Sequence, residues 1–401
     1  MSNIIIPKTM DRDERFAYMQ ECAAYDITER EANSNPAGGF KEGPFARKRT
    51  GNPPKVPKVM VTNQCIFNCQ YCGMRVSKEK RLRYVCTPRE VAEDAVKCAH
   101  QNGHGVFITS SIYRNPDYTE ELIIETLRII RTELFYRGYV HAKIMPGTDP
   151  ALIKKAGMLA DRIDVNIEFS HSDGYLSIAK QKNKKTILTP MAFIRDNIKA
   201  SKNFAPSGQT TQIIAGAMGE SDNTLLTLAE ALYKKYALRR VYYSGYGVPE
   251  HKPDCLPKES IPFWRIRRLY QGDRLLQLYG FKAEDILPAD RPFLDQDIDP
   301  KAEWALRNLH IYPIEIQKAD YFTLLRVPGL GVESANKIIN ERKRGSLTHK
   351  DLKRMGVWMN RAKFFITCSG KYEGKICRGE LYGTELLRQM LIDGPGQVKL
   401  E

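Results

Sequence analysis

Residues 65–72 read CIFNCQYC and place three cysteines within eight positions, separated first by three residues and then by two. Thiolates at this density suit zinc or an iron–sulfur cluster. A closed zinc site takes four ligands, often from a second Cys-x-x-Cys pair, and the chain has no second pair. Cys86, fourteen residues after Cys72, does not make one. The loop therefore predicts a metal site with three protein thiolates, from Cys65, Cys69 and Cys72, and one open position.

The cysteine loop stands directly after the first of six short apolar or β-branched runs. These runs are expected to be strands at 58–62, 105–110, 139–146, 162–169, 209–216 and 240–246. Helical periodicity fills the intervals between them. Alternating strands and helices predict an α/β fold with a parallel sheet, a partial (β/α)6 TIM-like barrel with its helices outside. Functional groups in such folds gather at the C-terminal ends of the strands, where the cysteine loop lies.

Helix-start residues support this arrangement. Thr87 precedes PREVAEDAVKCAHQN and is the expected N-cap of that helix. Thr119 is the expected N-cap of the next helix, which ends at Gly138. Further helices are expected within 149–159, 189–204 and 221–236.

The Cys-x-x-x-Cys-x-x-Cys spacing after a first strand, with Tyr71 before the third cysteine, resembles the signature of the radical S-adenosylmethionine (SAM) superfamily. The resemblance implies a [4Fe–4S] cluster on the three cysteines, with SAM bound to the open iron. One electron from the cluster then cleaves SAM to methionine and a 5′-deoxyadenosyl radical, which takes a hydrogen atom from the substrate. It also implies an external electron donor. The alternative is a zinc or adventitious metal site.

The resemblance places SAM contacts at the ends of other strands. Ser110 and Ser111 stand where many relatives carry a Gly-Gly-Glu stretch, so their backbone carbonyls are expected to bind the amine of SAM. Lys182 is expected to bind the carboxylate of SAM. The alternative for Lys182 is a solvated basic loop, KQKNKK at 180–185.

The nucleoside part of SAM has its own expected contacts. Glu168, with Ser170 beside it, is expected to bind the ribose hydroxyls, and its alternative role is a solvent-exposed strand end. Gly216 is expected to leave a bare backbone beside the adenine. Tyr71 is expected to pack against the cluster or the adenine.

Three side chains near the sixth strand are candidates for the catalytic site: Tyr243, Tyr246 and Cys255. Tyrosines at such spacing are more often core residues. The other cysteines are read first as free buried thiols, since cysteine is often buried. A second cluster or a hydrogen-donating thiol is the alternative for this set, which is Cys22, Cys86, Cys98, Cys368 and Cys377.

A second informative stretch, RVPGLGVESANKIINERKRGS at 326–346, resembles a helix-hairpin-helix motif, and a weaker copy follows at 351–366 with Gly356 at its hairpin. In that motif the hairpin amides and the following helix bind a phosphate oxygen. Between positions 337 and 363 there are nine Lys or Arg and two acidic residues. The alternative is a packing or protein-contact unit. The expected nucleic-acid contacts are Gly329, Gly331, Lys337, Arg342, Lys343, Arg344, Lys353 and Arg354.

The chain divides by composition into five parts. These are an N-terminal helical extension and linker (1–54), a barrel (55–250), a linker with a helical wrap (251–314), a small all-α helix-hairpin-helix domain (315–370) and a polar tail (371–401). The formal net charge of +15 favours a polyanionic partner. Without a long apolar run or a secretory signal, the protein is expected to be cytoplasmic and to avoid membranes.

Taken together, the order of cysteine loop, barrel and hairpin over about 55–370 resembles a group of radical SAM proteins named for DNA modification or repair. That group is linked to a uracil-DNA-glycosylase-like partner. The resemblance implies hydrogen abstraction from a nucleotide of DNA. Alternatives are a radical SAM enzyme acting on RNA such as tRNA, a non-catalytic iron–sulfur protein that binds DNA or senses redox state, and a zinc DNA-binding module.

Overall fold

The computed structural model describes residues 10–23, 56–78, 81–102, 105–374 and 383–392. These residues form two compact units. The first contains the described residues up to 220 together with 231–262, and the second contains 221–230 and the described residues from 263 onward. The long helix α8 (Asp222–Tyr236) contributes to both. No helix in the described part of the chain is long and apolar enough to span a membrane.

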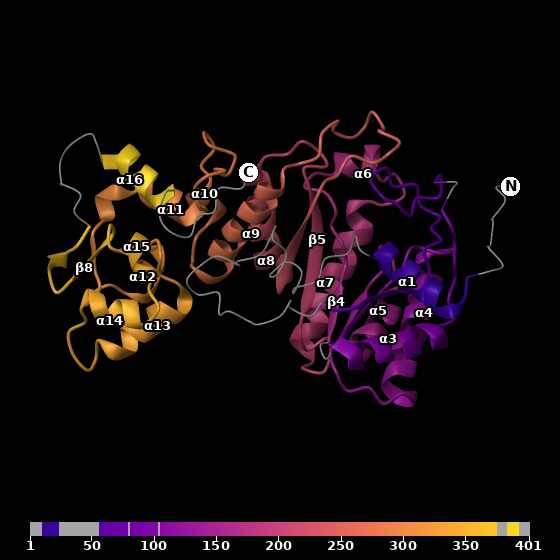
Figure 1. Ribbon diagram of the computed structural model, residues 1–401. Helices are drawn as coiled ribbons and strands as arrows, with labels where there is room; N and C mark the ends of the chain where they lie inside the picture. The colour runs from indigo at the N-terminus through magenta and orange to yellow at the C-terminus, as the bar shows by residue number, and fades with distance from the viewer. Residues whose placement is uncertain (1–9, 24–55, 79–80, 103–104, 375–382, 393–401) are drawn as a thin grey trace. The chain divides into compact units, whose positions relative to one another are not determined.

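The first unit is built on a six-stranded sheet (Figure 1) whose strands are all parallel and stand in chain order. The strands are β1 (Lys58–Met60), β2 (Val106–Thr109), β3 (Val140–Lys143), β4 (Arg162–Asp164), β5 (Gln209–Ala215) and β6 (Arg240–Gly245). Within the described residues no pairing joins β6 back to β1. The expected parallel α/β architecture is therefore confirmed as an open sheet.

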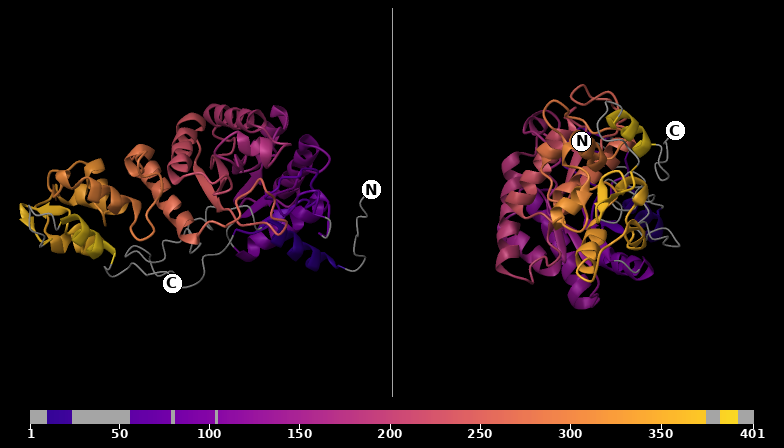
Figure 2. Two further views of the ribbon diagram at one scale, coloured as in Figure 1. Left: turned by 90° about the horizontal axis from the view of Figure 1, so that it is seen from above. Right: turned by 90° about the vertical axis from the view of Figure 1, so that its left-hand side faces the viewer.

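Helices connect the strands and cover one face of this sheet (Figure 2). They are α3 (Pro88–Asn102), α4 (Pro116–Arg128) with a π-helical turn to Glu133, α5 (Pro150–Leu159), α6 (Asp173–Ser177), α7 (Lys184–Ala200) and α8. On the covered face, the amide of Gln209 donates to the carbonyls of Met191 in α7 and Tyr236 in α8. That face is therefore the one packed against helices.

Several boundaries differ from those expected: helix α7, for example, begins at Lys184 instead of 189, and strand β3 ends at Lys143 instead of 146. Helix α4 is capped by Asn115, whose side chain accepts from the Tyr118 amide at 2.8 Å, and Thr119 lies inside the first turn. Pro at the first helical position explains the earlier start, since its missing N–H is unpaired there anyway. Strand β4 ends at Asp164 instead of Phe169, and beyond it Glu168 makes only an isolated parallel bridge with Ile213, at a φ of +62°. The expected Thr87 cap is confirmed, with reciprocal bonds between Thr87 and Glu90.

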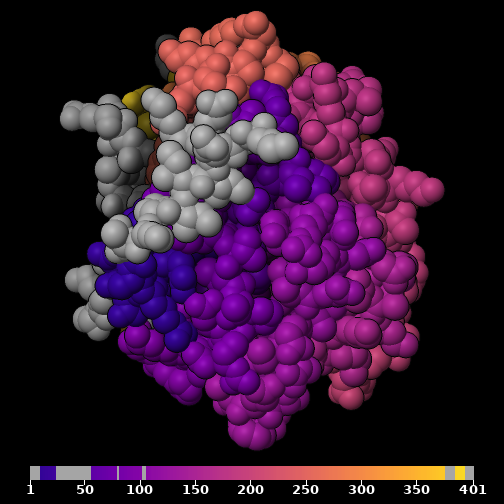
Figure 3. Space-filling view, turned by 90° about the vertical axis from the view of Figure 1, so that its right-hand side faces the viewer, coloured from indigo at the N-terminus to yellow at the C-terminus, as the bar shows by residue number. Residues whose placement is uncertain are grey.

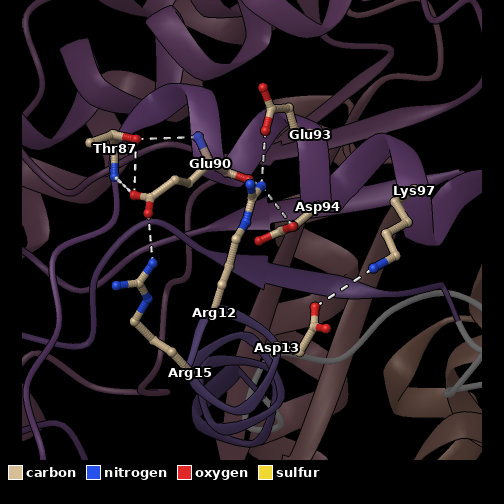
Figure 4. A network of polar contacts seen from close by, with 8 residues as sticks. All are labelled: Arg12, Asp13, Arg15, Thr87, Glu90, Glu93, Asp94 and Lys97. Atoms are coloured by element: carbon tan, nitrogen blue, oxygen red, sulfur yellow. Dashed lines mark hydrogen bonds and ion pairs between the residues drawn. The ribbon is translucent and has the colours of Figure 1, made fainter. Parts of the chain in front are cut away.

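An N-terminal helix, α1 (Arg12–Cys22), packs beside β1 and α3, and it forms the indigo surface in Figure 3. Its buried Met19 and Cys22 join an apolar cluster with Met74 and Tyr84, and Cys65 and Cys72 pack against that cluster. The side of α1 that faces α3 carries a line of ion pairs (Figure 4). The helix therefore lies over the region of the cysteine loop.

The second unit contains α9 (Phe263–Leu278), α10 (Ala283–Ile286), α11 (Pro300–Arg307) and four short helices. The four are α12 (Tyr321–Arg326), α13 (Val332–Glu341), α14 (His349–Arg354) and α15 (Met359–Ala362). The expected linker thus belongs, from residue 263, to the same compact unit as the hairpins.

The expectation of an all-α second unit with a polar tail is wrong in two places. A three-stranded sheet forms from β7 (Ile314–Glu315), β8 (Ile366–Cys368) and β9 (Lys371–Tyr372). Helix α16 (Gly383–Ile392) follows, and its Leu387 and Leu391 are buried in the apolar core of the unit. Strands of two or three residues are too short to show an alternating pattern in the sequence. Helix α16 is stabilised by packing of its buried leucines, which the sequence of a short helix does not reveal.

Candidate active site

The cysteine loop leaves the C-terminal end of β1 and stays tied to the extension of β2. The Val61 amide donates to Thr109, the Ser111 amide to Thr62 and the Ile66 amide to Ile112, each at 2.9 Å. Backbone bonds between the two segments therefore continue beyond both strands as far as Ile66. The loop begins where the sheet ends, as expected for an α/β active site.

The three thiols differ in burial. Cys69 is buried, while Cys65 and Cys72 are partly exposed. The amide of Phe67 donates to the sulfur of Cys65 at 3.4 Å, and the amide of Met74 donates to the sulfur of Cys72 at 3.3 Å. Such amides stabilise negative sulfur. Burial and the neighbouring thiols raise the pKa of Cys72 to about 12, and burial also raises the pKa of Cys69, so these thiols stay protonated until a cation replaces the proton.

Tyr71, Glu168 and Lys182 are brought together beside Cys69. The ammonium of Lys182 lies 2.8 Å from a carboxylate oxygen of Glu168 and donates to the hydroxyl of Tyr71 at 3.3 Å. Burial lowers the pKa of Lys182, but the negative charge of Glu168 outweighs it, so the pKa of Lys182 is raised. Lys182 is a permanent, nearly buried cation beside the cysteine loop rather than part of a solvated basic loop.

The backbone around Glu168 is specialised. Its φ of +62° is unfavourable for a residue with a side chain, by roughly 1–3 kcal/mol. The Glu168 amide donates to Gln212 and its carbonyl accepts from Ile214, so β5 holds this conformation in place. Tyr175 adds a hydroxyl bond to the Ile167 carbonyl. The bonds from β5 and from Tyr175 hold the backbone in this conformation, in which the Glu168 carboxylate accepts from Lys182.

Ser170 supplies an orphaned polar atom next to this group. Its hydroxyl oxygen is buried and has no hydrogen-bond partner among the residues that the structure describes. A buried hydroxyl without a partner is unfavourable by about 1–3 kcal/mol. Phe169 packs its ring edge to face against Tyr71, with ring centroids 5.7 Å apart. The site thus offers three thiols, an ion pair and an unused hydroxyl, which fits a bound polar cofactor better than a closed structural loop.

The serines and the glycine expected to bind SAM occupy strand ends. Ser110 donates its hydroxyl to the Ser111 carbonyl at 2.8 Å, and Ser111 is buried against the start of the cysteine loop. Gly216 has a φ of +87°, and a Cβ there would lie 2.1 Å from a methyl group of Ile261. The need for glycine at 216 thus follows from its backbone and from Ile261, before any ligand is considered.

The three catalytic candidates are not brought together. Tyr243 is fully buried and pairs in register with Ile213, on the same face of the sheet as Gln209, so it points toward the helices. The Tyr246 hydroxyl donates to the Pro257 carbonyl at 2.9 Å. Cys255 is exposed. The placement of Tyr243 contradicts its expected role, because strand alternation turns it away from the open face.

The sequence reasoning missed a polar group on the open face of the sheet. Lys143 donates to Asp164 and to Asn166, both at 2.8 Å, and His141 lies 3.1 Å from the same carboxylate. Burial lowers the pKa of His141, and Lys143 and His141 lower the pKa of Asp164 against its own burial. Charged residues at alternate positions inside VHAK and RID were the available signal.

All eight described cysteines are free. Cys22, Cys98 and Cys368 are buried, Cys86 is partly exposed, and Cys377 lies outside the described residues. Among the described residues no three Cys, His, Asp or Glu side chains converge to hold one metal ion. A four-iron cluster binds its thiolates on separate irons, so it does not require such convergence.

The expected nucleic-acid residues lie in the second unit. Lys337, Lys343, Arg344, Lys353 and Arg354 are exposed. Arg342, in contrast, donates to the carbonyls of Ile316 and Ala319 at 3.0 and 2.6 Å, so its guanidinium is used by the fold. Gly329 has a φ of +85°, and Gly331 is the N-cap of α13, with only one atom near the position of a Cβ.

Comparison with known families identifies the class of protein. Residues 59–232 match the radical SAM superfamily. The match covers the sheet from β1 through the described cysteine loop to α8. Residues 59–232 therefore form a radical SAM domain, and the match does not specify a reaction. The superfamily uses a [4Fe–4S] cluster and SAM, and Cys65, Cys69 and Cys72 are the residues that would hold the cluster.

Solved structures give weaker likenesses. HydG, a maturase of the [FeFe]-hydrogenase, shares 15% identity over 67% of this chain and 56% of its own length, with a TM-score of 0.42. HydG from Carboxydothermus hydrogenoformans shares 13% identity over 77% of this chain and 70% of its own length, with a TM-score of 0.43. The radical SAM methyltransferase TsrM from Kitasatospora setae shares 12% identity over 48% of this chain and 37% of its own length, with a TM-score of 0.36. Likenesses this low carry no argument about activity. No curated protein matches the chain.

The bound cluster and SAM would supply the electron and the carbon-centred radical. The chain's own residues hold the reactants in place. Lys182 and Glu168 present opposite charges within one hydrogen-bond length, which matches the carboxylate and hydroxyl groups of SAM. The ring of Tyr71, held at its hydroxyl by Lys182, closes the side of the loop next to Cys69. On its other side the loop packs against the apolar cluster that contains Met19 and Cys22 of α1.

Proposed function

We propose that this radical SAM enzyme acts on nucleic acid, in DNA modification or repair, and that its second unit binds the phosphate backbone through a tandem helix-hairpin-helix. A single observation carries the proposal: two glycine hairpins are bonded to each other beneath exposed lysines and arginines. The hairpin 327–331 joins α12 to α13, and the turn at Gly356 leads from α14 to α15.

The two hairpins are joined directly by a backbone hydrogen bond. The amide of Trp358 donates to the Gly329 carbonyl at 3.0 Å. A Cβ on Gly329 would lie 2.6 Å from the Trp358 carbonyl oxygen, so only glycine allows this approach. The helices pack through buried Ala335, Ile338 and Leu352. This pairing supports a tandem motif rather than two unrelated turns.

The basic side chains are available to a polyanion. The side chains of Arg344 and Arg354 are 79% and 81% exposed, and each faces only one acidic neighbour within its own helix or turn. Exposed pairs of this kind contribute about 0–1 kcal/mol, so a phosphate competes easily with them. Lys337, Lys343 and Lys353 are also exposed. Contacts of this type position a nucleic acid without reading its sequence.

The target follows from the chemistry of the class. A radical that abstracts hydrogen must approach the reacting carbon closely, and a base stacked in a duplex is out of reach. We therefore expect a flipped, single-stranded or damaged nucleotide. A uracil-DNA-glycosylase-like protein fits this picture as a partner, because it too works on a base outside the stack.

Binding of the full chain to a fluorescent 20-base-pair DNA duplex tests the proposal. The Lys337→Ala/Lys343→Ala/Lys353→Ala variant is expected to weaken binding and to reduce the salt dependence by about one unit of log–log slope per lysine. The matched control, Lys185→Ala/Lys199→Ala/Lys202→Ala, removes the same charge from exposed positions of the first unit. Equal losses in both variants would refute a role for the hairpins, and stronger competition by tRNA would move the substrate to RNA.

Product analysis tests the activity itself. Anaerobic reduction with SAM and deuterated DNA containing defined lesions should transfer deuterium into 5′-deoxyadenosine. Cleavage of SAM without any such transfer, in the presence of DNA or tRNA, would leave the class assignment intact and overturn the proposed substrate.

A further inference from the structure

Arg83 holds both ends of the cysteine loop. One guanidinium nitrogen donates to the carbonyls of Asn63 at 2.6 Å and Met74 at 2.9 Å, and the other donates to the carbonyl of Arg75 at 2.7 Å. Asn63 precedes the first cysteine by two residues, and Met74 follows the third by two. One side chain therefore closes the loop at its base.

The backbone that carries Arg83 is itself fixed against the start of the loop. Thr62 pairs with Val85 in an antiparallel bridge, and the Cys86 amide donates to Val61 at 3.0 Å. The side chain of Asn63 accepts from the Tyr84 amide at 2.8 Å. The guanidinium is thus delivered from a paired segment rather than from a free loop.

Helix α1 holds the same segment from its other side. The Tyr18 hydroxyl donates to the Leu82 carbonyl at 3.2 Å. Arg81 donates to the sulfur of Cys22 at 3.0 Å and to the sulfur of Met74 at 3.3 Å. The apolar cluster around Met19 fills the space between them. The position of Arg83 is therefore determined from both sides.

The charge of Arg83 is close enough to the thiols to interact with them. Burial and Arg81 lower the pKa of Arg83, while negative charge on Cys65 and Cys72 acts to raise it. An arginine remains charged throughout the physiological range despite such shifts. A positive charge beside a cluster stabilises its reduced, more negative state and raises its reduction potential.

We propose that Arg83 is a positioning residue of the active site: it ties the two ends of the cysteine loop together and holds a positive charge beside the cluster thiolates. The cluster is expected from the radical SAM domain alone. The role of Arg83 therefore does not depend on the proposal that the protein acts on nucleic acid. Because the fork of an arginine reaches several carbonyls at once and a lysine does not, the structural and electrostatic parts of the role are separable.

Two variants and one control test this. Arg83→Gln should bind at least twofold less iron after anaerobic reconstitution, and its cluster should have a lower midpoint potential in a titration followed by electron paramagnetic resonance. Arg83→Lys keeps the positive charge, so its cluster should have the wild-type midpoint potential. It lacks the guanidinium fork, so the two ends of the cysteine loop should stay less firmly held than in the wild type. The Val76 amide donates to the Phe67 carbonyl at 2.9 Å. In both Arg83 variants this amide should exchange its hydrogen with solvent at least tenfold faster than in the wild type.

Arg131 is the matched control. It is a comparably placed arginine of the same unit that donates to three carbonyls, those of Leu159, Tyr136 and Gly138. Arg131→Gln should leave the midpoint potential and the exchange of Val76 unchanged. If Arg83→Gln matches the wild type in iron content and potential, or if Arg83→Lys leaves the exchange of Val76 unchanged, the proposal is wrong. The same holds if Arg131→Gln reproduces the changes of Arg83→Gln.

Discussion

The cysteine loop of the first unit and the hairpin 327–331 of the second are both irregular segments, and each is held by a cation that bonds to backbone carbonyls. Arg83 bonds to four carbonyls around the cysteine loop, those of Asn63, Met74, Arg75 and, at 3.4 Å, Lys78. Lys301 bonds to the carbonyls of Leu325, at 3.3 Å, and Leu330 around the hairpin. Both cations donate to backbone carbonyls that lie in loops or at a helix end, where the regular bonding of helices and strands ends.

The two cations differ in how their charge is maintained. Arginine stays ionised at any pH the protein meets. Burial lowers the pKa of Lys301 to about 7, although the adjacent Asp299 favours the charged form. The loop expected to hold a redox cofactor thus has a permanent charge, and the hairpin has a cation that titrates. The comparison predicts that changes to the two regions have separate and different consequences.

The largest expected effect is on the cysteine loop. Replacing Cys69 by Ala removes a thiolate from the buried centre of the motif, so SAM cleavage to 5′-deoxyadenosine should fall to background. Chromatography of the reduced, SAM-treated protein measures this. The tryptophan fluorescence of the variant should be unchanged, since Trp264, Trp304 and Trp358 all belong to the second unit. Persistent 5′-deoxyadenosine formation would remove the three-thiolate assignment.

The next effect concerns the ion pair beside that loop. Lys182→Met leaves the carboxylate of Glu168 buried without its cation, which should lower the free energy of unfolding of the first unit by about 3–5 kcal/mol. Urea denaturation followed by circular dichroism measures the loss. The double variant Lys182→Met/Glu168→Gln removes both charges and should regain most of that stability. SAM affinity should be low in both variants, so a double variant with wild-type affinity would separate the pair from cofactor binding.

A smaller effect should appear in the second unit as a pH dependence. The unfolded chain keeps the proton of Lys301 up to the ordinary pKa of 10.5, whereas the folded chain releases it near 7. Between these values the unfolded state binds more protons, so stability rises with pH, by up to about 1.4 kcal/mol per pH unit, and is lost as pH falls toward 7. Denaturation followed by tryptophan fluorescence measures it. Lys301→Met should abolish this rise, and an equal rise in the variant would assign it to other groups.

The contrast also explains what the sequence could predict. Motif spacing and strand–helix alternation are local properties, and they gave the parallel sheet, the position of the cysteine loop and the capping of α3 at Thr87. The meeting of Tyr71, Glu168 and Lys182 depends on a left-handed residue at 168, which no local preference of glutamate predicts. The bond of Arg83 to Asn63 and the pairing of Lys143 with Asp164 join residues 20 and 21 positions apart in the sequence. Single-sequence patterns carry little information about such contacts.

The smallest expected effect lies between α1 and α3, where charges are exposed (Figure 4). Arg12 bonds to Glu93 and Asp94, both at 3.0 Å, but its side chain is 45% exposed. Solvent screens such pairs, so Arg12→Ala should lower the free energy of unfolding by less than about 1 kcal/mol. Urea denaturation at low and high salt measures the difference, which should shrink as salt rises. Met19→Ala is the contrasting variant, because its buried side chain packs in the same cluster as Cys65 and Cys72 and its loss should be larger, about 2–5 kcal/mol. If Arg12→Ala is the more damaging of the two, α1 is held by its charges, and apolar packing does not account for its place over the cysteine loop.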